Sequence, residues 1–250
     1  MIGMDFSNKN YIVTGGAGGI GKAVVAGIVA GGGKVALVDI NMEAAEATRQ
    51  EVSSEQVSTY KVDLGNAEEI KTVLTKIMGD MGQIHGLINN GGIVSTKKFV
   101  DLEQDEWDRV MAINLTSTYC SIHAIYPHMV ENKYGRIVNV ASVAGKVGGG
   151  LLGTSAYAAS KAGVIGFTKA IAKEGGPHNV CCCAVCPAFT KTPMTANMDE
   201  ATRNKILAAI PLNRAAEPEE IANLILFYAS DLASFITGEI GDADGGLTLD

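Results

Sequence analysis

The sequence is short of several features that define whole classes of protein. No apolar run reaches the roughly 18–20 residues that a membrane-spanning helix needs. Acidic residues outnumber basic ones, and the net charge of −7 excludes the positive footprint that non-specific nucleic-acid binding requires. The first residues lack the apolar segment of a signal peptide, so we expect a cytoplasmic protein without membrane or nucleic-acid partners.

Length and composition fit one large folded unit. The chain has 250 residues, of which 47% are hydrophobic and 19% charged. This composition excludes intrinsic disorder and allows a sizeable core. We therefore expect a single domain over residues 1–250.

Short apolar runs alternate with longer stretches of helical periodicity along almost the whole chain. This alternation predicts an α/β fold, a doubly wound (Rossmann-like) parallel sheet of about seven strands with helices on both faces. The expected strands are Tyr11–Thr14, Lys34–Val38, Val57–Val62, Gly86–Asn89, Arg136–Ala141, Val180–Val185 and Glu239–Asp242. The expected helices are Gly19–Ala30, Met42–Ser53, Ala67–Met81, Gln104–Val130, Ser155–Glu174 and Glu217–Ser230. We expect the irregular segment Pro187–Leu212 to be a loop over the substrate.

A glycine-rich turn joins the first expected strand to the first expected helix. It reads Thr14-Gly15-Gly16-Ala17-Gly18-Gly19-Ile20-Gly21. Glycines permit a tight turn and close backbone approach, so a pyrophosphate can sit at the helix N-terminus. Asp39 follows the second strand, where its carboxylate can accept hydrogen bonds from an adenosine ribose. Together these features predict a dinucleotide site.

A competing motif overlaps this turn. Residues Gly16 to Lys22 read G-x-x-x-x-G-K, which is nearly a nucleoside-triphosphate loop. Ala23 follows, however, and it has no hydroxyl to bind Mg²⁺. A kinase or ATPase is therefore disfavoured.

Three further residues suggest acid–base chemistry. Tyr157 and Lys161 are four residues apart early in an expected helix, which places them on one helix face. A nearby ammonium should lower the tyrosine pKa by about 1–3 units, which makes a phenol effective as a general acid or base. Ser142 ends the fifth strand, and such sheets bind ligands at the carboxyl ends of their strands. Ser142 is thus a candidate to orient a substrate oxygen.

These motifs together resemble the short-chain dehydrogenase/reductase family, in its single-domain form of about 250 residues. The resemblance covers nearly the whole chain. The glycine turn resembles the cofactor fingerprint, Asn89-Asn90-Gly91-Gly92 resembles an Asn-Asn-Ala-Gly segment with Gly91 in place of alanine, and Asp244-Gly245-Gly246 resembles the C-terminal signature. The family's four catalytic positions fall on Asn114, Ser142, Tyr157 and Lys161. The implied cofactor contacts are Gly15, Gly18, Gly19, Ile20, Gly21, Asp39, Asp63, Leu64, Asn90, Tyr157, Lys161 and Thr190.

The resemblance also implies a mechanism. Tyr157 exchanges a proton with the substrate oxygen, and Ser142 hydrogen-bonds that oxygen. Lys161 lowers the tyrosine pKa and holds the nicotinamide ribose, while Asn114 positions a water behind Lys161. No metal is required for this chemistry.

The chain departs from the family pattern at three places. The segment between the catalytic serine and tyrosine is slightly longer than usual, and we expect Gly148–Leu152 to form a flexible loop over the substrate. Ala188 replaces the glycine that commonly follows Pro187, and Cys183 replaces a common asparagine. Alanine tolerates positive φ poorly, so we expect the backbone at this point to differ.

Residues 181–187 read Cys-Cys-Cys-Ala-Val-Cys-Pro, which admits a metal site, a redox centre or a buried strand. Successive residues on a strand face opposite ways, so Cys181 and Cys183 cannot converge on a zinc ion with Cys182. In a strand covered on both faces, cysteine behaves as a small hydrophobe. We expect core packing and no metal.

The combined pattern predicts an NAD-dependent oxidoreductase that interconverts a small secondary alcohol and a ketone. Asp39 should repel the 2′-phosphate of NADP, and Gly18 offers no compensating charge. Two alternatives stay open: a 3-oxoacyl-(acyl-carrier-protein) reductase of fatty-acid synthesis, which usually uses NADPH, and a catalytically silent cofactor-binding protein. The resemblance further implies a homo-oligomer, a tetramer or a dimer, assembled through helices 104–130 and 155–174.

Overall fold

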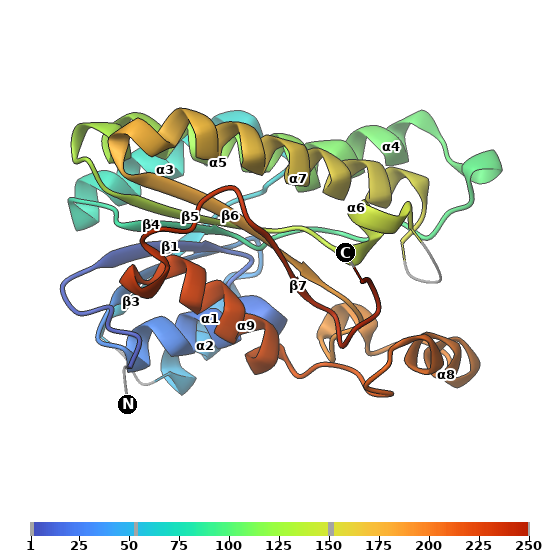
Figure 1. The fold of residues 1–250 in the computed structure, drawn as a ribbon. Helices are drawn as coiled ribbons and strands as arrows, with labels where there is room; N and C mark the ends of the chain where they lie inside the picture. Colours follow the sequence, from blue (N-terminus) through green and yellow to red (C-terminus); the bar gives the residue numbers. More distant parts are fainter. Residues whose placement is uncertain (1–2, 53–54, 150–152, 250) are drawn as a thin grey trace.

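A seven-stranded parallel sheet lies between two layers of helices (Figure 1). The computed structural model describes residues 3–52, 55–149 and 153–249. The strands lie in the order β3-β2-β1-β4-β5-β6-β7, so the predicted doubly wound, single-domain architecture is confirmed. Their bounds are β1 Asn10–Thr14, β2 Lys34–Asp39, β3 Val57–Lys61, β4 Gly86–Asn89, β5 Gly135–Val140, β6 Val180–Pro187 and β7 Ile240–Ala243.

Each face of the sheet has its own hydrophobic core. Successive residues of β1 point into opposite cores. Val13 packs with α1 and α9, whereas Ile12 packs with α3 and α5. Double coverage explains why the strands read as continuous apolar runs. The helices are α1 Gly19–Ala30, α2 Met42–Glu51, α3 Ala67–Met81, α4 Gln104–Met111, α5 Ser117–Glu131, α6 Val143–Val147, α7 Ser155–Gly175, α8 Glu200–Ala209 and α9 Pro218–Ala229. Within the described ranges, none of them is both long and apolar enough to cross a bilayer.

The chain changes direction across the sheet at β1, which pairs with β2 on one side and with β4 on the other. The loops after β1 and β4 therefore diverge, and this switch point is where doubly wound sheets bind ligands. The two loops touch at Gly15, where a Cβ atom would lie 2.7 Å from the Cα of Gly91. Gly15 also has a φ of +62°, so only glycine fits this contact without strain.

Two helices that the sequence analysis missed lie near this edge. The predicted irregular segment Pro187–Leu212 contains α8, whose first turn is capped by Asp199. The large apolar side chains of α8 are Ile206 and Leu207, which are too few to give a periodic pattern from which the helix could be predicted. α6 spans only Val143–Val147 and is too short to show a periodic pattern.

The predicted helix 104–130 is not a regular α-helix throughout. A π-helical turn, Ala112–Thr116, separates α4 from α5. Such turns hold an extra residue and often occur at functional sites. The predicted helix 42–53 ends earlier, at Glu51, and Ser53 lies outside the described residues.

Candidate active site

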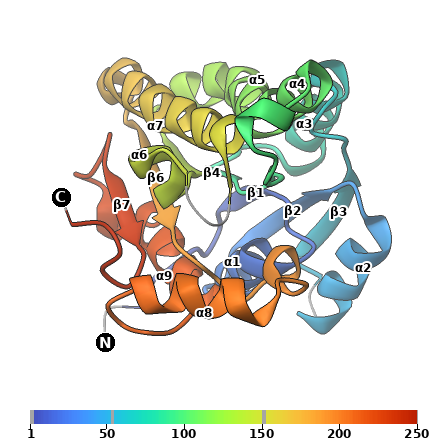
Figure 2. The same cartoon turned by 90° about the vertical axis from the view of Figure 1, so that its right-hand side faces the viewer.

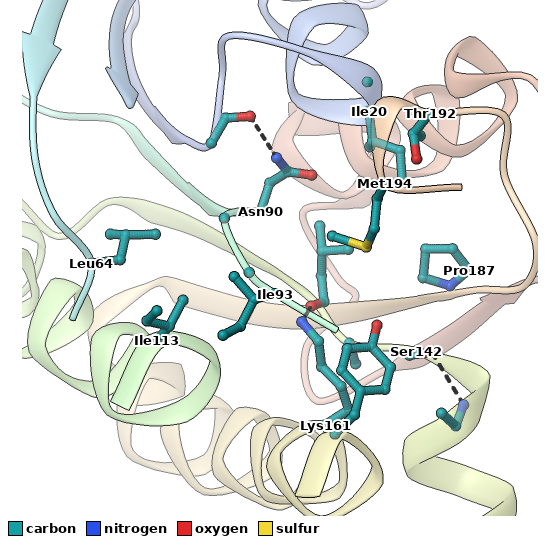
Figure 3. A pocket seen from close by; sticks show the side chains of 18 of the residues that line it. Ile20, Leu64, Asn90, Ile93, Ile113, Ser142, Lys161, Pro187, Thr192 and Met194 are labelled. Atoms are coloured by element: carbon teal, nitrogen blue, oxygen red, sulfur yellow. Dashed lines mark hydrogen bonds between the residues drawn. The ribbon is translucent and has the colours of Figure 1, made fainter. Parts of the chain in front are cut away.

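A cavity of about 1390 Å³ opens along the carboxyl edge of the sheet. Figure 3 shows it from close by, with Leu64 and Ile113 at one end, Ile93 in the middle, and Ser142 and Lys161 at the other. Most of the predicted site residues line it: Gly15, Gly18, Gly19, Ile20, Asp39, Asp63, Leu64, Asn90, Ser142, Tyr157, Lys161 and Thr190. Gly21 and Asn114 do not line the cavity, and both lie behind its wall.

The glycine turn is braced by Asn90. The Asn90 side-chain amide donates to the carbonyl oxygen of Gly15 at 2.9 Å (Figure 3). It also donates to the carbonyl oxygen of Thr14 at 3.2 Å. In return, the Thr14 hydroxyl accepts from the backbone N–H of Asn90 at 3.1 Å. A Cβ atom at Gly21 would lie 2.1 Å from the Gly15 oxygen, so the turn packs directly on α1. This rigid turn ends at a helix N-terminus where Gly18 has no side chain, which fits a pyrophosphate.

The carboxylate of Asp39 is fixed beside the glycine turn. One oxygen accepts from the backbone N–H of Ala17 and the other from that of Asn41, each at 3.0 Å. The nearest basic residue in sequence, Lys22, instead bonds Glu51 at 2.5 Å. Asp39 therefore presents its negative charge without a neutralising partner from that lysine.

Tyr157 and Lys161 lie on one face of α7, with the lysine ammonium 5.9 Å from the centre of the tyrosine ring. The ammonium donates to the carbonyl oxygen of Val140 at 2.7 Å. Burial lowers the pKa of Lys161 to about 8. Burial also raises the pKa of Tyr157, against a smaller opposing effect of the Ser142 hydroxyl.

The predicted lowering of the Tyr157 pKa by Lys161 is therefore wrong for the protein without ligands. Helical spacing brings the two residues to one face, but the ammonium bonds the backbone of β5 instead of the phenol. Desolvation then decides the shift, because burial disfavours the phenolate.

This direction can be tested by titration. We expect the absorbance of the wild-type protein minus that of its Tyr157→Phe variant to show no phenolate component with a midpoint below the ordinary tyrosine value of about 10, because burial raises the pKa of this phenol. The measurement is an ultraviolet difference titration of ligand-free protein between pH 7 and pH 10. A phenolate component centred near pH 8 would contradict the expectation.

Asn114 sits in the π-helical turn and is 1% exposed. Its side chain accepts from the N–H of Ile93 at 2.8 Å and donates to the oxygen of the same residue at 2.9 Å. It also donates to the Ser160 hydroxyl at 3.1 Å. Asn114 thus fixes the loop after β4 and, with it, Ile93 in the cavity wall. The sequence analysis missed Ile93 and Ser160, although Ile93 directly follows the Asn-Asn-Gly-Gly segment.

The cysteine run lies on β6 and is divided among separate cores. Cys182 packs under one face of the sheet and Cys183 under the other, while Cys186 belongs to a smaller cluster near α7. Burial raises the pKa of both Cys183 and Cys186 to about 11, so neither is a ready thiolate. Among the described residues, no three potential metal ligands come together.

The structure describes the backbone at two of the departures from the family pattern, Ala188 and the start of the segment Gly148–Leu152. Ala188 is absent from the described non-glycine residues with positive φ, so its backbone conformation is one that alanine tolerates. The expected difference from the backbone of other family members stays a prediction. Gly148 and Gly149 do have positive φ, at +84° and +102°. Residues 150–152 lie outside the described ranges, and the predicted loop over the substrate stays a prediction.

Comparison with known proteins agrees over almost the whole chain. The family model described as Enoyl-(Acyl carrier protein) reductase matches residues 15–248. The 3-oxoacyl-(acyl-carrier-protein) reductase FabG of Thermotoga maritima is 38% identical over 248 residues, which is 98% of this chain and 100% of that protein. The acetoacetyl-CoA reductase of Shinella zoogloeoides is 38% identical over 237 residues, 94% of this chain and 96% of that protein. The crystal structure of gox2181 matches with a TM-score of 0.94 at 31% identity, covering 97% and 96% of the two chains.

The fold and these relatives define an oxidoreductase that acts on CH–OH groups with a nicotinamide cofactor. The chain belongs to the short-chain dehydrogenase/reductase family.

Proposed function

We propose that the protein interconverts a secondary alcohol and a ketone with NAD(H), through Tyr157, Ser142, Lys161 and Asn114. One observation carries the proposal: a single cavity joins the Asp39 carboxylate at one end to Ser142, Tyr157 and Lys161 at the other. The bound nicotinamide supplies or accepts the hydride. The side chains of the protein handle the proton and the orientation of the substrate.

Tyr157 is the proton donor during ketone reduction. Its raised pKa keeps the phenol protonated at neutral pH, which is the form that reduction needs. The Ser142 hydroxyl oxygen already accepts from the N–H of Ala144 at 3.1 Å (Figure 3), so its own proton is available to the substrate oxygen. Lys161 holds the cofactor ribose, and Asn114 holds the wall behind it.

NAD(H) is favoured over NADP(H) by the charge at Asp39. A 2′-phosphate beside this carboxylate would bring two negative charges together. In the 3-oxoacyl reductase alternative, which usually uses NADPH, a positive charge is expected at this place. Lys22 does not supply it, since it is paired with Glu51.

The substrate end of the cavity favours a neutral ketone with apolar substituents. The charged residues that line the described part of the cavity are Asp39, Asp63, Glu68, Arg109 and Lys161. Asp39 ends β2, and Asp63 and Glu68 lie after β3 and at the start of α3, so these three belong to the proposed adenosine end, whereas Arg109 lies on α4. Side chains near Ser142 are mainly apolar: Val143, Val147, Pro187, Phe189, Met194, Ile206 and Leu247. A carboxylate next to the carbonyl would therefore lose its hydration among these apolar side chains, while the Lys161 ammonium already donates to the Val140 oxygen.

A substrate panel tests this function. We expect NADH-dependent reduction of neutral ketones, and of 3-oxo esters, but little or no reduction of the matching free 3-oxo acids. The measurement is the loss of NADH absorbance under steady-state conditions. Faster turnover of a 3-oxoacyl thioester with NADPH would favour the fatty-acid reductase, and NADH binding without turnover of any ketone would favour the silent protein.

We also propose a homo-oligomer, a tetramer or a dimer, through the outer faces of α4, α5 and α7. Tyr119 on α5 is 49% exposed and its ring contacts that of Phe167 on α7, with centroids 6.2 Å apart. Partly exposed aromatic rings on neighbouring helices suit a contact with a second copy.

A further inference from the structure

The short helix α6 fixes the position of Ser142. The Ser142 hydroxyl caps this helix by accepting from the Ala144 N–H, and the Ser142 carbonyl oxygen accepts from the Gly145 N–H at 3.0 Å. Both oxygen atoms of the serine are thus tied to the first turn of α6. A displacement of the helix must move the hydroxyl that faces the substrate.

α6 packs against α7 so closely that their backbones touch. A Cβ atom at Gly145 would lie 2.7 Å from the backbone nitrogen of Ala162 and from the carbonyl carbon of Lys161. Figure 2 shows α6 beneath α7 and beside the edge of the sheet that β7 forms. One side of α6 is therefore held by the turn of α7 that carries Lys161.

The other side of α6 is held by an ion pair to β7. The Lys146 ammonium contacts an Asp242 carboxylate oxygen at 2.6 Å. The two side chains are only 17% and 19% exposed, which sets this pair apart from the mostly exposed ion pairs elsewhere on the surface. Asp242 pairs in register with Cys186 on β6, so its backbone is part of the sheet.

The Asp242 carboxylate depends on its lysine partner. Its second oxygen is buried and has no hydrogen-bond partner among the described residues. A carboxylate in such a place is stable only while a positive charge stays beside it. The pair therefore links α6 to the sheet with a definite geometry, and it does so without lining the cavity.

We propose that Lys146 and Asp242 are positioning residues, which hold α6 so that the Ser142 hydroxyl meets the substrate oxygen. This inference rests on the proposed function of Ser142. Reaction rates are sensitive to small misplacements of the reacting groups, and a shift of about 1 Å can lower a rate 10²-fold. The ion pair holds the side of α6 that faces β7, and α7 holds the other side.

The test compares variants in two backgrounds, wild type and Ser142→Ala. We expect Lys146→Met and Asp242→Asn to lower kcat for ketone reduction about 10- to 100-fold in the wild type, with the Kd for NADH unchanged. In the Ser142→Ala background, the same changes should have almost no further effect on kcat, because the group that they position is gone. Lys146→Arg preserves the ion pair and should keep kcat near the wild-type value.

A matched control is the exposed pair Lys76–Asp80 on α3, whose side chains are 63% and 41% exposed. Lys76→Met should leave kcat unchanged. Asp242→Asn removes the buried charge itself, so it remains informative even if Lys146→Met does not fold. Thermal unfolding of each variant separates a loss of stability from a loss of kcat.

Three outcomes would overturn the inference. The first is an unchanged kcat in Asp242→Asn. The second is an equal loss of kcat on adding Lys146→Met or Asp242→Asn to the wild type and to Ser142→Ala. The third is a lower Tm with a normal kcat in Lys146→Met. Wild-type turnover in Ser142→Ala would instead refute the proposed role of the serine, and the positioning role with it. The two failures are thus distinguishable from one set of proteins.

Discussion

Replacing Tyr157 by phenylalanine should lower kcat about 10²–10⁴-fold while NADH still binds, because general acid–base catalysis contributes a factor of this size. The phenol is the proposed proton donor, and the substitution removes only its hydroxyl. The ring itself lies against the backbone of Gly153, where a Cβ atom would come within 2.4 Å of the ring. Phenylalanine should keep that contact, so the shape of the cavity is preserved.

The measurement combines steady-state kinetics with a fluorescence titration of NADH. Tyr60→Phe is the matched control, since Tyr60 lies on β3, outside the cavity, and its hydroxyl bonds the surface residue Asp80. The control should keep the wild-type kcat. Normal turnover in Tyr157→Phe would remove the tyrosine from the mechanism.

Replacing Asp39 by alanine should have the second large effect, on the choice of cofactor. We expect the wild-type kcat/KM with NADH to exceed that with NADPH by about 100-fold, because two like charges in contact at a partly open site repel by a few kcal/mol. Loss of hydrogen bonds to a charged acceptor should lower kcat/KM with NADH about 10-fold in the variant. The value with NADPH should rise, so that the preference largely disappears.

Asp39→Asn separates charge from hydrogen bonding. The asparagine retains an oxygen that can accept from the backbone N–H of Asn41 or Ala17, but it does not repel a phosphate. It should therefore relax the preference with a smaller loss of NADH efficiency than alanine. Lys22→Ala serves as the control, because Lys22 is paired with Glu51. A wild-type enzyme that works equally well or better with NADPH would contradict the assignment and favour the 3-oxoacyl reductase.

Most of the sheet could be predicted from sequence, because strands that are buried on both faces appear as continuous apolar runs. The bounds of α1, α3 and β4 agree with the expectation, since their apolar residues pack on the two cores that β1 serves. The glycine turn was also predictable, because backbone contacts such as that of Gly21 with Gly15 tolerate no side chain. Local pattern and tertiary packing agree in these elements.

The remaining features depend on contacts between distant residues. The π-helical turn coincides with the bonds from Asn114 to Ile93, which are 21 positions apart in the chain. The direction of the Tyr157 pKa shift depends on which group the Lys161 ammonium bonds. The spacing of the two residues on the helix does not specify that partner. The pairing of Lys146 with Asp242 joins residues 96 positions apart and leaves no trace in either local sequence.

Helix α8 forms part of the cavity wall through Ile206 and Ala209, yet it has no buried residue. Elements with few buried apolar contacts open at a free energy far below that of global unfolding. Amides in α8 should accordingly exchange with solvent hydrogen sooner than those of α7, which has buried residues along its length. We therefore expect the size limit for substrates to depend on how readily α8 opens as well as on the volume of the closed cavity. On that expectation, substrate specificity reflects the mobility of one helix with few buried contacts as well as the shape of the site.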